Sequence, residues 1–163
     1  MYDEINNKLI NNIVKTNKNK SSHWEKYKEG CDKVNRVADP ANWRVAKAIF
    51  VADDLAKAKE YALGPNSPYV FYYKQLFTKF SAMGKIGLFK TDINQSDEDV
   101  TFDDVCKKMI IWGTTDKVID DLSAFRDEIG DFGTLMYAGM DWADAELARR
   151  SMILTAEKVV PLL

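Results

Sequence analysis

A glycine and two threonines, Gly113-Thr114-Thr115, form the stretch of this sequence that is best suited to bind a ligand. The apolar residues Ile110–Trp112 before it predict a short buried strand, and the residues up to Phe125 after it predict a helix. Glycine permits a tight turn, threonine offers a hydroxyl, and the free N–H groups at the start of a helix attract anions. The turn can therefore hold a phosphate. A strand-to-helix turn capped by Thr114 or Thr115 explains the same residues without a ligand, and Asp116 in the first turn would repel an anion.

Arg149 and Arg150, in the last predicted helix, are the other side chains that can bind a phosphate. Ion pairs with Glu146 and Asp144, or a place on the outer surface, are the simpler interpretation. The stretch from Tyr69 to Phe80 carries aromatic residues at helical spacing. Such a stripe is more typical of helix packing than of a substrate pocket.

Other common kinds of active site are excluded by residues that the chain lacks or holds only once. His23 is the only histidine, so a metal site built from several histidines is excluded. A Ser-His-Asp triad would have to use His23, and no nucleophile-elbow motif accompanies it. The chain also has no glycine-rich dinucleotide motif and no P-loop. The sequence predicts no metal site and identifies no catalytic residue.

The predicted elements around the turn are parallel strands, each followed by a helix. Residues Trp43–Val51 predict a strand that is apolar on both faces, as in a buried parallel sheet. Residues 133–139 predict a further strand after the one at Ile110–Trp112. Ligands of parallel sheets bind at the carboxyl ends of the strands, which here are the segments 52–54, 113–115 and 139–142.

Three hydroxyl residues mark predicted helix starts, namely Ser22, Ser67 and Thr101. Pro68, directly after Ser67, strengthens the second of these because proline is favoured at the first helical position. An apolar stripe over residues 2–17 predicts one more helix. The series as a whole predicts an α/β fold that is rich in helices.

Several short sequences occur together from the glycine-threonine turn onward: Ala124-Phe125-Arg126, Gly130-Asp131-Phe132-Gly133-Thr134-Leu135, Gly139-Met140-Asp141-Trp142, Arg149-Arg150-Ser151-Met152, Ala156-Glu157 and Val160-Pro161. In this combination they resemble the carboxyl-terminal end of the luciferase-like family of flavin-dependent monooxygenases. The resemblance extends back through Trp43 to about His23, so that residues 1–22 form an unmatched polar and helical leader. Met140 stands where the family often has a histidine, and any role of that histidine is therefore not carried over.

The resemblance implies a (β/α)8 TIM barrel, but a whole barrel takes roughly 250 residues. The chain has 163 residues. We therefore expect a single domain over residues 1–163 that forms a partial barrel, with about three parallel strands and covering helices. In this interpretation the chain is either the carboxyl-terminal portion of a longer enzyme or a short relative of such enzymes. If the flavin contacts lie in earlier strands of the barrel, the chain by itself is an inactive portion.

The resemblance also implies FMN as the cofactor, in its reduced form and supplied by a partner reductase or NAD(P)H, with O₂ and a small organic molecule as substrates. The cofactor contacts implied at the turn are Trp112, Gly113, Thr114 and Thr115, although Trp112 packed on a helix is the alternative. Catalytic side chains stay unassigned because the flavin itself supplies the oxygen chemistry. Two other functions remain open: a non-catalytic partial barrel that acts by oligomerisation, and a reductase that uses a deazaflavin.

Composition limits the partners. The formal net charge of −2 and the lack of a concentrated basic face argue against nucleic acid. There is no apolar run long enough for a membrane span and no signal peptide. Cys31 and Cys106 lack metal-ligand spacing, which predicts two small buried side chains. Their small number suits a reducing compartment and predicts a cytoplasmic protein. Three strands leave two open sheet edges, so we expect a homo-oligomer or a helix covering an edge.

Overall fold

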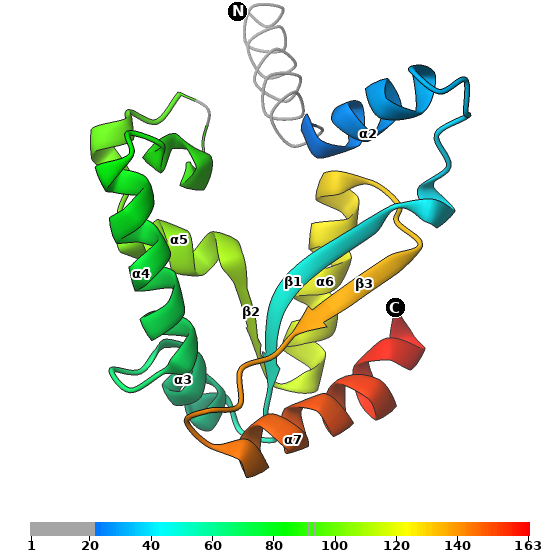
Figure 1. The fold of residues 1–163 in the computed structure, drawn as a ribbon. Coiled ribbons are helices and arrows are strands. Elements are labelled where there is room, and N and C mark those ends of the chain that lie inside the picture. Colours follow the sequence, from blue (N-terminus) through cyan, green and yellow to red (C-terminus); the bar gives the residue numbers. More distant parts are fainter. Residues whose placement is uncertain (1–21, 91, 93) are drawn as a thin grey trace, which may run out of the picture.

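The computed structural model describes residues 22–163 except 91 and 93. Its core is a sheet of three parallel strands, which confirms the predicted parallel α/β arrangement (Figure 1). The strands are β1 (Arg44–Val51), β2 (Ile110–Gly113) and β3 (Thr134–Ala138). The α-helices are α2 (Ser22–Asp32), α3 (Leu55–Leu63), α4 (Pro68–Ala82), α5 (Phe102–Met109), α6 (Thr115–Ile129) and α7 (Ala145–Leu154). The helix predicted over residues 2–17 lies outside the described residues.

Strand β1 lies in the middle of the sheet, in the order β2-β1-β3. Its carboxyl half pairs with β2, from Ala48 opposite Ile110 to Val51 opposite Gly113. Its amino half pairs with β3, from Arg44 opposite Thr134 to Ala48 opposite Ala138. Strands β2 and β3 are consecutive in the sequence but are not neighbours in the sheet. This order differs from that of consecutive strands in a barrel, where each strand pairs with the next one.

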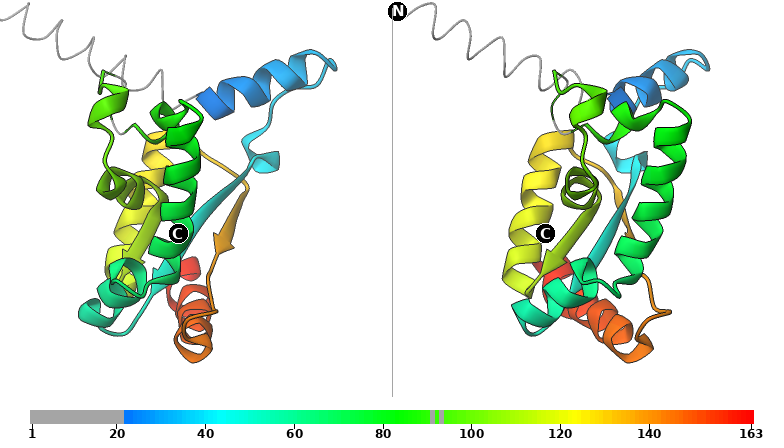
Figure 2. Two further views of the ribbon diagram at one scale, coloured as in Figure 1. Left: turned by 60° about the vertical axis from the view of Figure 1, so that its left-hand side comes forward. Right: turned by 90° about the vertical axis from the view of Figure 1, so that its left-hand side faces the viewer.

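The two faces of the sheet are covered by different helices (Figure 2). Phe50 points to one face and packs with Tyr61 of α3 and Tyr69 of α4, while Val105 of α5 belongs to the same cluster. The opposite face carries Ile49, Val51 and Ile111, which pack against Val118 and Leu122 of α6 and Leu154 of α7. The alternation follows from the period of two in a strand.

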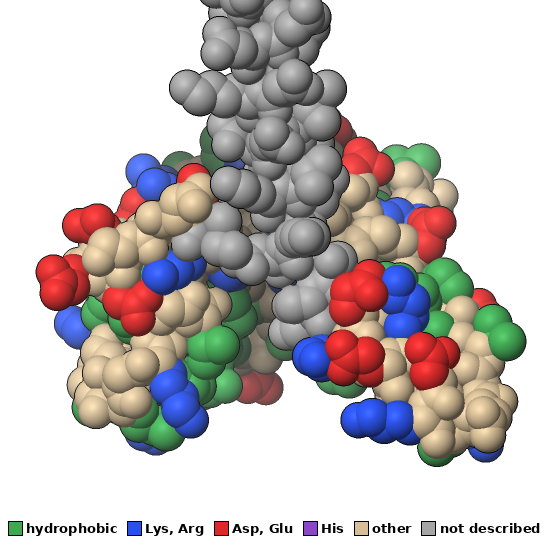
Figure 3. All heavy atoms as spheres, turned by 90° about the horizontal axis from the view of Figure 1, so that it is seen from above, with side chains coloured by type: hydrophobic (Ala, Val, Ile, Leu, Met, Phe, Trp, Pro, Cys, Tyr) green, Lys and Arg blue, Asp and Glu red, His purple; other side chains and the backbone are tan. Residues whose placement is uncertain are grey.

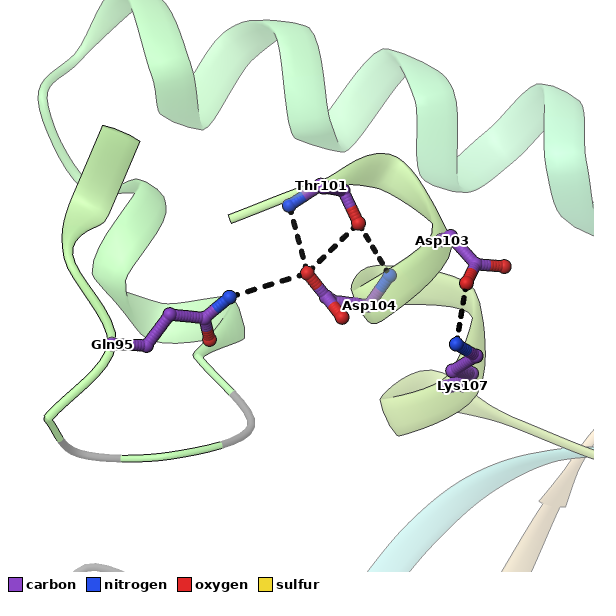
Figure 4. Close-up of polar contacts among 5 residues, drawn as sticks. All are labelled: Gln95, Thr101, Asp103, Asp104 and Lys107. Carbon is purple, nitrogen blue, oxygen red and sulfur yellow. Dashed lines mark hydrogen bonds and ion pairs between the residues drawn. The ribbon is translucent and has the colours of Figure 1, made fainter. Parts of the chain in front are cut away.

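Local sequence signals place the helix starts as predicted. Ser67 caps α4, its hydroxyl accepting from the N–H of Val70, and Pro68 is the first helical residue. The predicted start at Thr101 is also confirmed, because Thr101 and Asp104 form a reciprocal capping box (Figure 4). Helix α2 begins at Ser22 as predicted, but the side chain of Ser22 is not among those described.

The prediction that β1 is buried on both faces holds only for its carboxyl half. Residues Ala48–Val51 are all buried, whereas Arg44 and Ala46 are exposed. On the neighbouring strand, Met136 is 57% exposed beside Ala46. The reason is that α3, α4 and α5 pack against the carboxyl half of this face, while no described helix packs on its amino half.

The approach of β3 to β1 depends on a glycine. The N–H groups of Gly133 and Thr134 both donate to the carbonyl of Trp43. A Cβ atom at Gly133 would lie 1.8 Å from the carbonyl oxygen of Ala41, so no other residue fits there without moving the backbone. The two cysteines are free thiols. Cys106 is buried as predicted, whereas Cys31 is only half-buried.

The described surface mixes both signs of charge. Viewed from above, acidic and basic side chains alternate over the described part of that face (Figure 3). Several charged side chains of the described chain are paired locally, such as Lys26 with Glu29 and Lys107 with Asp103. No helix in the described part of the chain is long and apolar enough to cross a membrane.

Candidate functional site

The carboxyl ends of β1 and β2 lie side by side, as the parallel arrangement predicts. Val51 is the register partner of Gly113, and the N–H of Ala52 donates to the carbonyl oxygen of Gly113 at 3.0 Å. The predicted ligand segments 52–54 and 113–115 are therefore brought together. The third segment, 139–142, is less close in register, because β3 ends opposite Ala48 rather than opposite Val51.

Side-chain contacts from α3 reach this third segment. The hydroxyl of Tyr61 donates to the carbonyl oxygen of Met140 at 2.7 Å and lies 3.3 Å from that of Asp144. Met140 is buried in the same cluster as Phe50. Trp142, two residues further, is 60% exposed. The segment after β3 is thus attached to α3 at both of its ends.

The glycine of the predicted turn has the conformation that makes glycine necessary. Gly113 is buried and has a φ of +155°, which residues with side chains rarely adopt. A Cβ atom there would lie 2.7 Å from Cδ of Lys117. The Lys117 ammonium lies 5.1 Å from the ring centroid of Trp112, a cation–π distance, and 2.5 Å from a carboxylate oxygen of Asp121. Trp112 itself is half-buried and packs against the cluster around Phe50.

Helix α6 begins directly after this turn, with Thr114 in the N-cap position. The predicted position of the cap is therefore correct, but the Thr114 hydroxyl makes no capping hydrogen bond. The N-cap side chains Asp54, Ser67, Thr101 and Asp144 do cap α3, α4, α5 and α7. The first N–H groups of a helix have no partner within the helix. The start of α6 consequently keeps donors and two threonine hydroxyls for another group.

The predicted partners of Arg150 were wrong. Its guanidinium makes a bidentate ion pair with Asp53, at 2.7 and 2.9 Å, and not with Glu146 or Asp144. This guanidinium lowers the pKa of the Asp53 carboxyl. The pair connects α7 to the residue two positions after the end of β1. Its neighbour Arg149 is exposed and makes no ion pair with a described residue.

The hydrogen bonds that Tyr69, Tyr137 and Ser151 make near the end of β1 were not recognised from the sequence. The N–H of Val51 donates to Oγ of Ser151 at 2.8 Å, and the hydroxyl of Tyr137 lies 2.9 Å from the same oxygen. The hydroxyl of Tyr69 donates to the carbonyl oxygen of Ile49 at 2.9 Å. Burial raises the pKa of Tyr61, Tyr69 and Tyr137, so all three hydroxyls stay protonated.

A sequence signal for Ser151 exists. Ala148, Ser151 and Leu154 are the buried residues of α7 and recur every three positions, so Ser151 lies in an apolar stripe where a hydroxyl needs a partner. The aromatic stripe of α4 packs against the core in part, as the sequence indicates, whereas Tyr72 is exposed. Tyr69 and Tyr73 are buried, and Phe80 contacts Phe89.

Two surface hollows stand out, and neither is lined by the turn at Trp112–Thr115. One of about 460 Å³ lies between α2 and the following loop, with Tyr27, Cys31 and Asn42 among its lining residues. The other, of about 280 Å³, lies along α3. In the described part of the chain no cluster of three or more histidine, cysteine or acidic residues could hold a metal ion. The side chain of His23 lies outside that part.

Comparison with known proteins connects this arrangement with monooxygenases. No family model matches the chain. The chain is 26% identical over 141 residues to 4-hydroxyprotoasukamycin monooxygenase of Streptomyces nodosus subsp. asukaensis. The aligned region covers 86% of this chain and 36% of that enzyme.

Two solved structures share the fold. One is the FMN complex of the oxygenating constituent of 3,6-diketocamphane monooxygenase from the CAM plasmid of Pseudomonas putida, a type II Baeyer-Villiger monooxygenase. It superimposes with a TM-score of 0.72 at 22% identity, over 87% of this chain and 39% of that one. The other is the monooxygenase RslO1 of Streptomyces bottropensis, with a TM-score of 0.55 at 18% identity, over 89% of this chain and 38% of that one. The chain thus spans less than two fifths of the length of the proteins that it resembles.

Proposed function

We propose that the chain is the carboxyl-terminal part of a luciferase-like, flavin-dependent monooxygenase and that it contributes to an FMN site through the turn Trp112–Thr115. The observation that carries this proposal is the TM-score of 0.72 with an FMN-bound monooxygenase over 87% of the chain. The sequence relative at 26% identity is a monooxygenase as well. Both agree with the family that the sequence motifs resemble. We expect O₂ and a small organic molecule as substrates.

The proposal includes a partial (β/α)8 barrel. Three parallel strands with covering helices support this part of the proposal, whereas the order β2-β1-β3 and the helices on both faces differ from a regular barrel, in which helices form only an outer ring. The matched share of each relative, 36 to 39%, is consistent with a portion of that size. The remaining strands would pair with the outer edges of β2 and β3, which have no strand partner in the described chain.

The residues at the turn fit an FMN phosphate. The start of α6 presents N–H groups with no side-chain cap, and the hydroxyls of Thr114 and Thr115 can donate to phosphate oxygens. Lys117 brings a positive charge to the same turn, although Asp121 partly neutralises it. Asp116, in the first turn of α6, is an unfavourable charge, but its side chain is exposed to solvent.

Reduced FMN supplies the oxygen chemistry when it is bound, since flavins react with O₂. The residues of this chain would bind and orient the cofactor. Gly113 lets the backbone come close to a ligand because it has no side chain. Trp112 offers an aromatic edge beside the turn, and Phe50 with Tyr61 excludes water below it.

We also propose a cytoplasmic homo-oligomer. The outer edges of β2 and β3 have no strand partner in the described chain, and such edges attract further strands. Two free thiols are typical of a reducing compartment.

An FMN titration tests the proposed site. We expect saturable quenching of flavin fluorescence when purified chain is added to oxidised FMN. Replacing Thr114 and Thr115 together by valine should weaken binding about tenfold, because hydrogen bonds to a charged phosphate are lost. Thr134→Val is the matched control, because Thr134 is exposed at the amino end of β3 and should leave the affinity unchanged. Absence of binding at millimolar FMN, or equal affinity in all variants, would refute the site.

A further inference from the structure

Beyond the end of β3, side chains replace a strand as the partner of β1. Strand β3 stops at Ala138, opposite Ala48. Residues in a strand direct their backbone groups alternately to the two sides, and Ala52 donates toward β2. Ile49 and Val51 therefore direct their backbone N–H and C=O groups to the β3 side of β1, where β3 has already ended. There Tyr69 donates to the Ile49 carbonyl, and Ser151 accepts from the Val51 N–H.

Two further hydrogen bonds, one to β3 and one within its own helix, hold Ser151 in place. Its side chain is completely buried, and its hydroxyl lies 2.9 Å from that of Tyr137, the second-last residue of β3. Its carbonyl accepts from the hydroxyl of Thr155 within α7. Arg150, the residue directly before Ser151, binds Asp53. Helix α7 thus holds both Val51 and Asp53.

We infer that Ser151 is a positioning residue for the turn at Gly113–Thr115, acting through the end of β1. The path consists of direct contacts. Ser151 binds the N–H of Val51, Val51 is the register partner of Gly113, and Ala52 donates to the carbonyl oxygen of Gly113. The turn starts at that carbonyl, so a shift of Val51 moves the residues that precede Thr114. The effect on cofactor binding rests on the function proposed above.

Substitution of Ser151 by alanine removes the side-chain acceptor of the Val51 N–H. A buried N–H without a partner is strongly unfavourable, so the end of β1 should move to regain one. Thr155→Val is the matched control. It also removes a buried hydroxyl from the same end of α7, but that hydroxyl binds only the helix backbone. Ser151→Thr keeps a hydroxyl at the position and should restore the wild-type behaviour.

Amide NMR on the full chain tests the inference directly. In Ser151→Ala we expect hydrogen exchange at Val51 and Ala52 to become at least about tenfold faster and the amide shifts of Gly113 and Thr114 to change. Thr155→Val should leave these amides as in the wild type. Unchanged amides at Gly113 and Thr114 in Ser151→Ala would overturn the inference, as would equal changes in both variants. If Ser151→Ala does not fold, Tyr137→Phe gives the same comparison, because it removes the hydroxyl that holds Ser151.

An FMN titration of the same variants separates this inference from the proposed function. If the wild type binds FMN, Ser151→Ala should raise its Kd about tenfold and Ser151→Thr should restore it. An unchanged Kd in Ser151→Ala would overturn the role of Ser151 while leaving the FMN site intact. If the wild type binds no FMN, the proposed function fails for this chain, and the amide shifts of Gly113 and Thr114 alone decide whether Ser151 positions the turn.

Discussion

The two halves of β1 have different surroundings although they belong to one strand of eight residues. The carboxyl half, Ala48–Val51, is buried on both faces and pairs with β2 on one side and with hydroxyls on the other. The amino half, Arg44–Lys47, pairs with β3 and leaves Arg44 and Ala46 exposed. One strand therefore joins a well-packed end, where the candidate ligand segments meet, to an open end.

In the amino half of β1, Lys47 makes polar contacts instead of packing in the core. Its ammonium donates to the carbonyl oxygen of Lys108, in the last turn of α5, and lies 4.6 Å from the ring centroid of Phe125. Burial lowers the pKa of this lysine. Residues Ile49–Val51, by contrast, contact uncharged hydroxyls and aromatic rings. The buried packing is therefore concentrated at the end of the strand that carries the candidate site.

The largest expected effect is a loss of stability on side-chain truncation. Truncation should lower the free energy of unfolding much more in the carboxyl half of β1 than in the amino half. Phe50 is 1% exposed and stacks on Tyr61 at 4.2 Å, so Phe50→Ala should destabilise the fold by about 3–5 kcal/mol. Met136→Ala, on the exposed part of the same face, should change stability by less than about 0.5 kcal/mol. Urea unfolding followed by circular dichroism measures both. Similar losses in the two variants would show that the amino half is packed as well.

A hydroxyl deletion should have an intermediate effect. Tyr69→Phe leaves the Ile49 carbonyl without its partner and should cost about 1–2 kcal/mol. Tyr72→Phe is the control on the same helix, because Tyr72 is 43% exposed and its hydroxyl has no partner among the described residues. The same urea experiment should show almost no change for the control. A neutral Tyr69→Phe would mean that side chains do not replace the missing strand.

The ion pair at the surface should have the smallest effect, and this effect should depend on pH. Arg150 lowers the pKa of Asp53, so the pair stabilises the folded state above the ordinary carboxyl pKa of about 3.9. The contribution is lost as the pH falls through the lowered value. Arg150→Gln should therefore lower Tm at pH 7, and the difference from wild type should disappear in acid. High salt should also reduce it.

Arg149→Gln provides the control for this measurement. Arg149 is the preceding residue on α7, is exposed, and has no ion pair with a described residue. Its replacement should leave Tm nearly unchanged at either pH. A larger effect for Arg149→Gln than for Arg150→Gln would contradict the role given to the Asp53 pair.

The helix starts at Ser67 and Thr101, which were predicted from neighbouring residues, were confirmed because local chemistry determines them. The capping box of Thr101 with Asp104 and the start of α4 at Ser67 involve residues at most three positions apart. The contacts at the candidate site instead join distant positions. Asp53 and Arg150 are separated by 97 positions, and Val51 and Ser151 by 100. Sequence periodicity gives the buried face of α7 but not the strand that this face meets, so neither pair could be predicted.

The candidate turn was itself predictable as a strand, a glycine and a helix start. Its free donors were not, because only the structure shows that the Thr114 hydroxyl leaves the start of α6 uncapped. The strand order could not be predicted from the sequence either. A short strand at Ile110–Gly113 pairs with whichever part of β1 the intervening helices bring to it, and α5 brings it to the carboxyl half.

Mapping of FMN binding on the amide NMR spectrum tests the central claim most directly, namely that the carboxyl end of β1 and β2 binds the flavin. We predict that titration with FMN shifts the amides of Trp112–Lys117 and of Ala52–Asp53. The amides of Arg44–Lys47 and Thr134–Met136 should stay in place. Shifts concentrated around the hollow between Tyr27 and Asn42, or no shifts at all at millimolar FMN, would contradict the account.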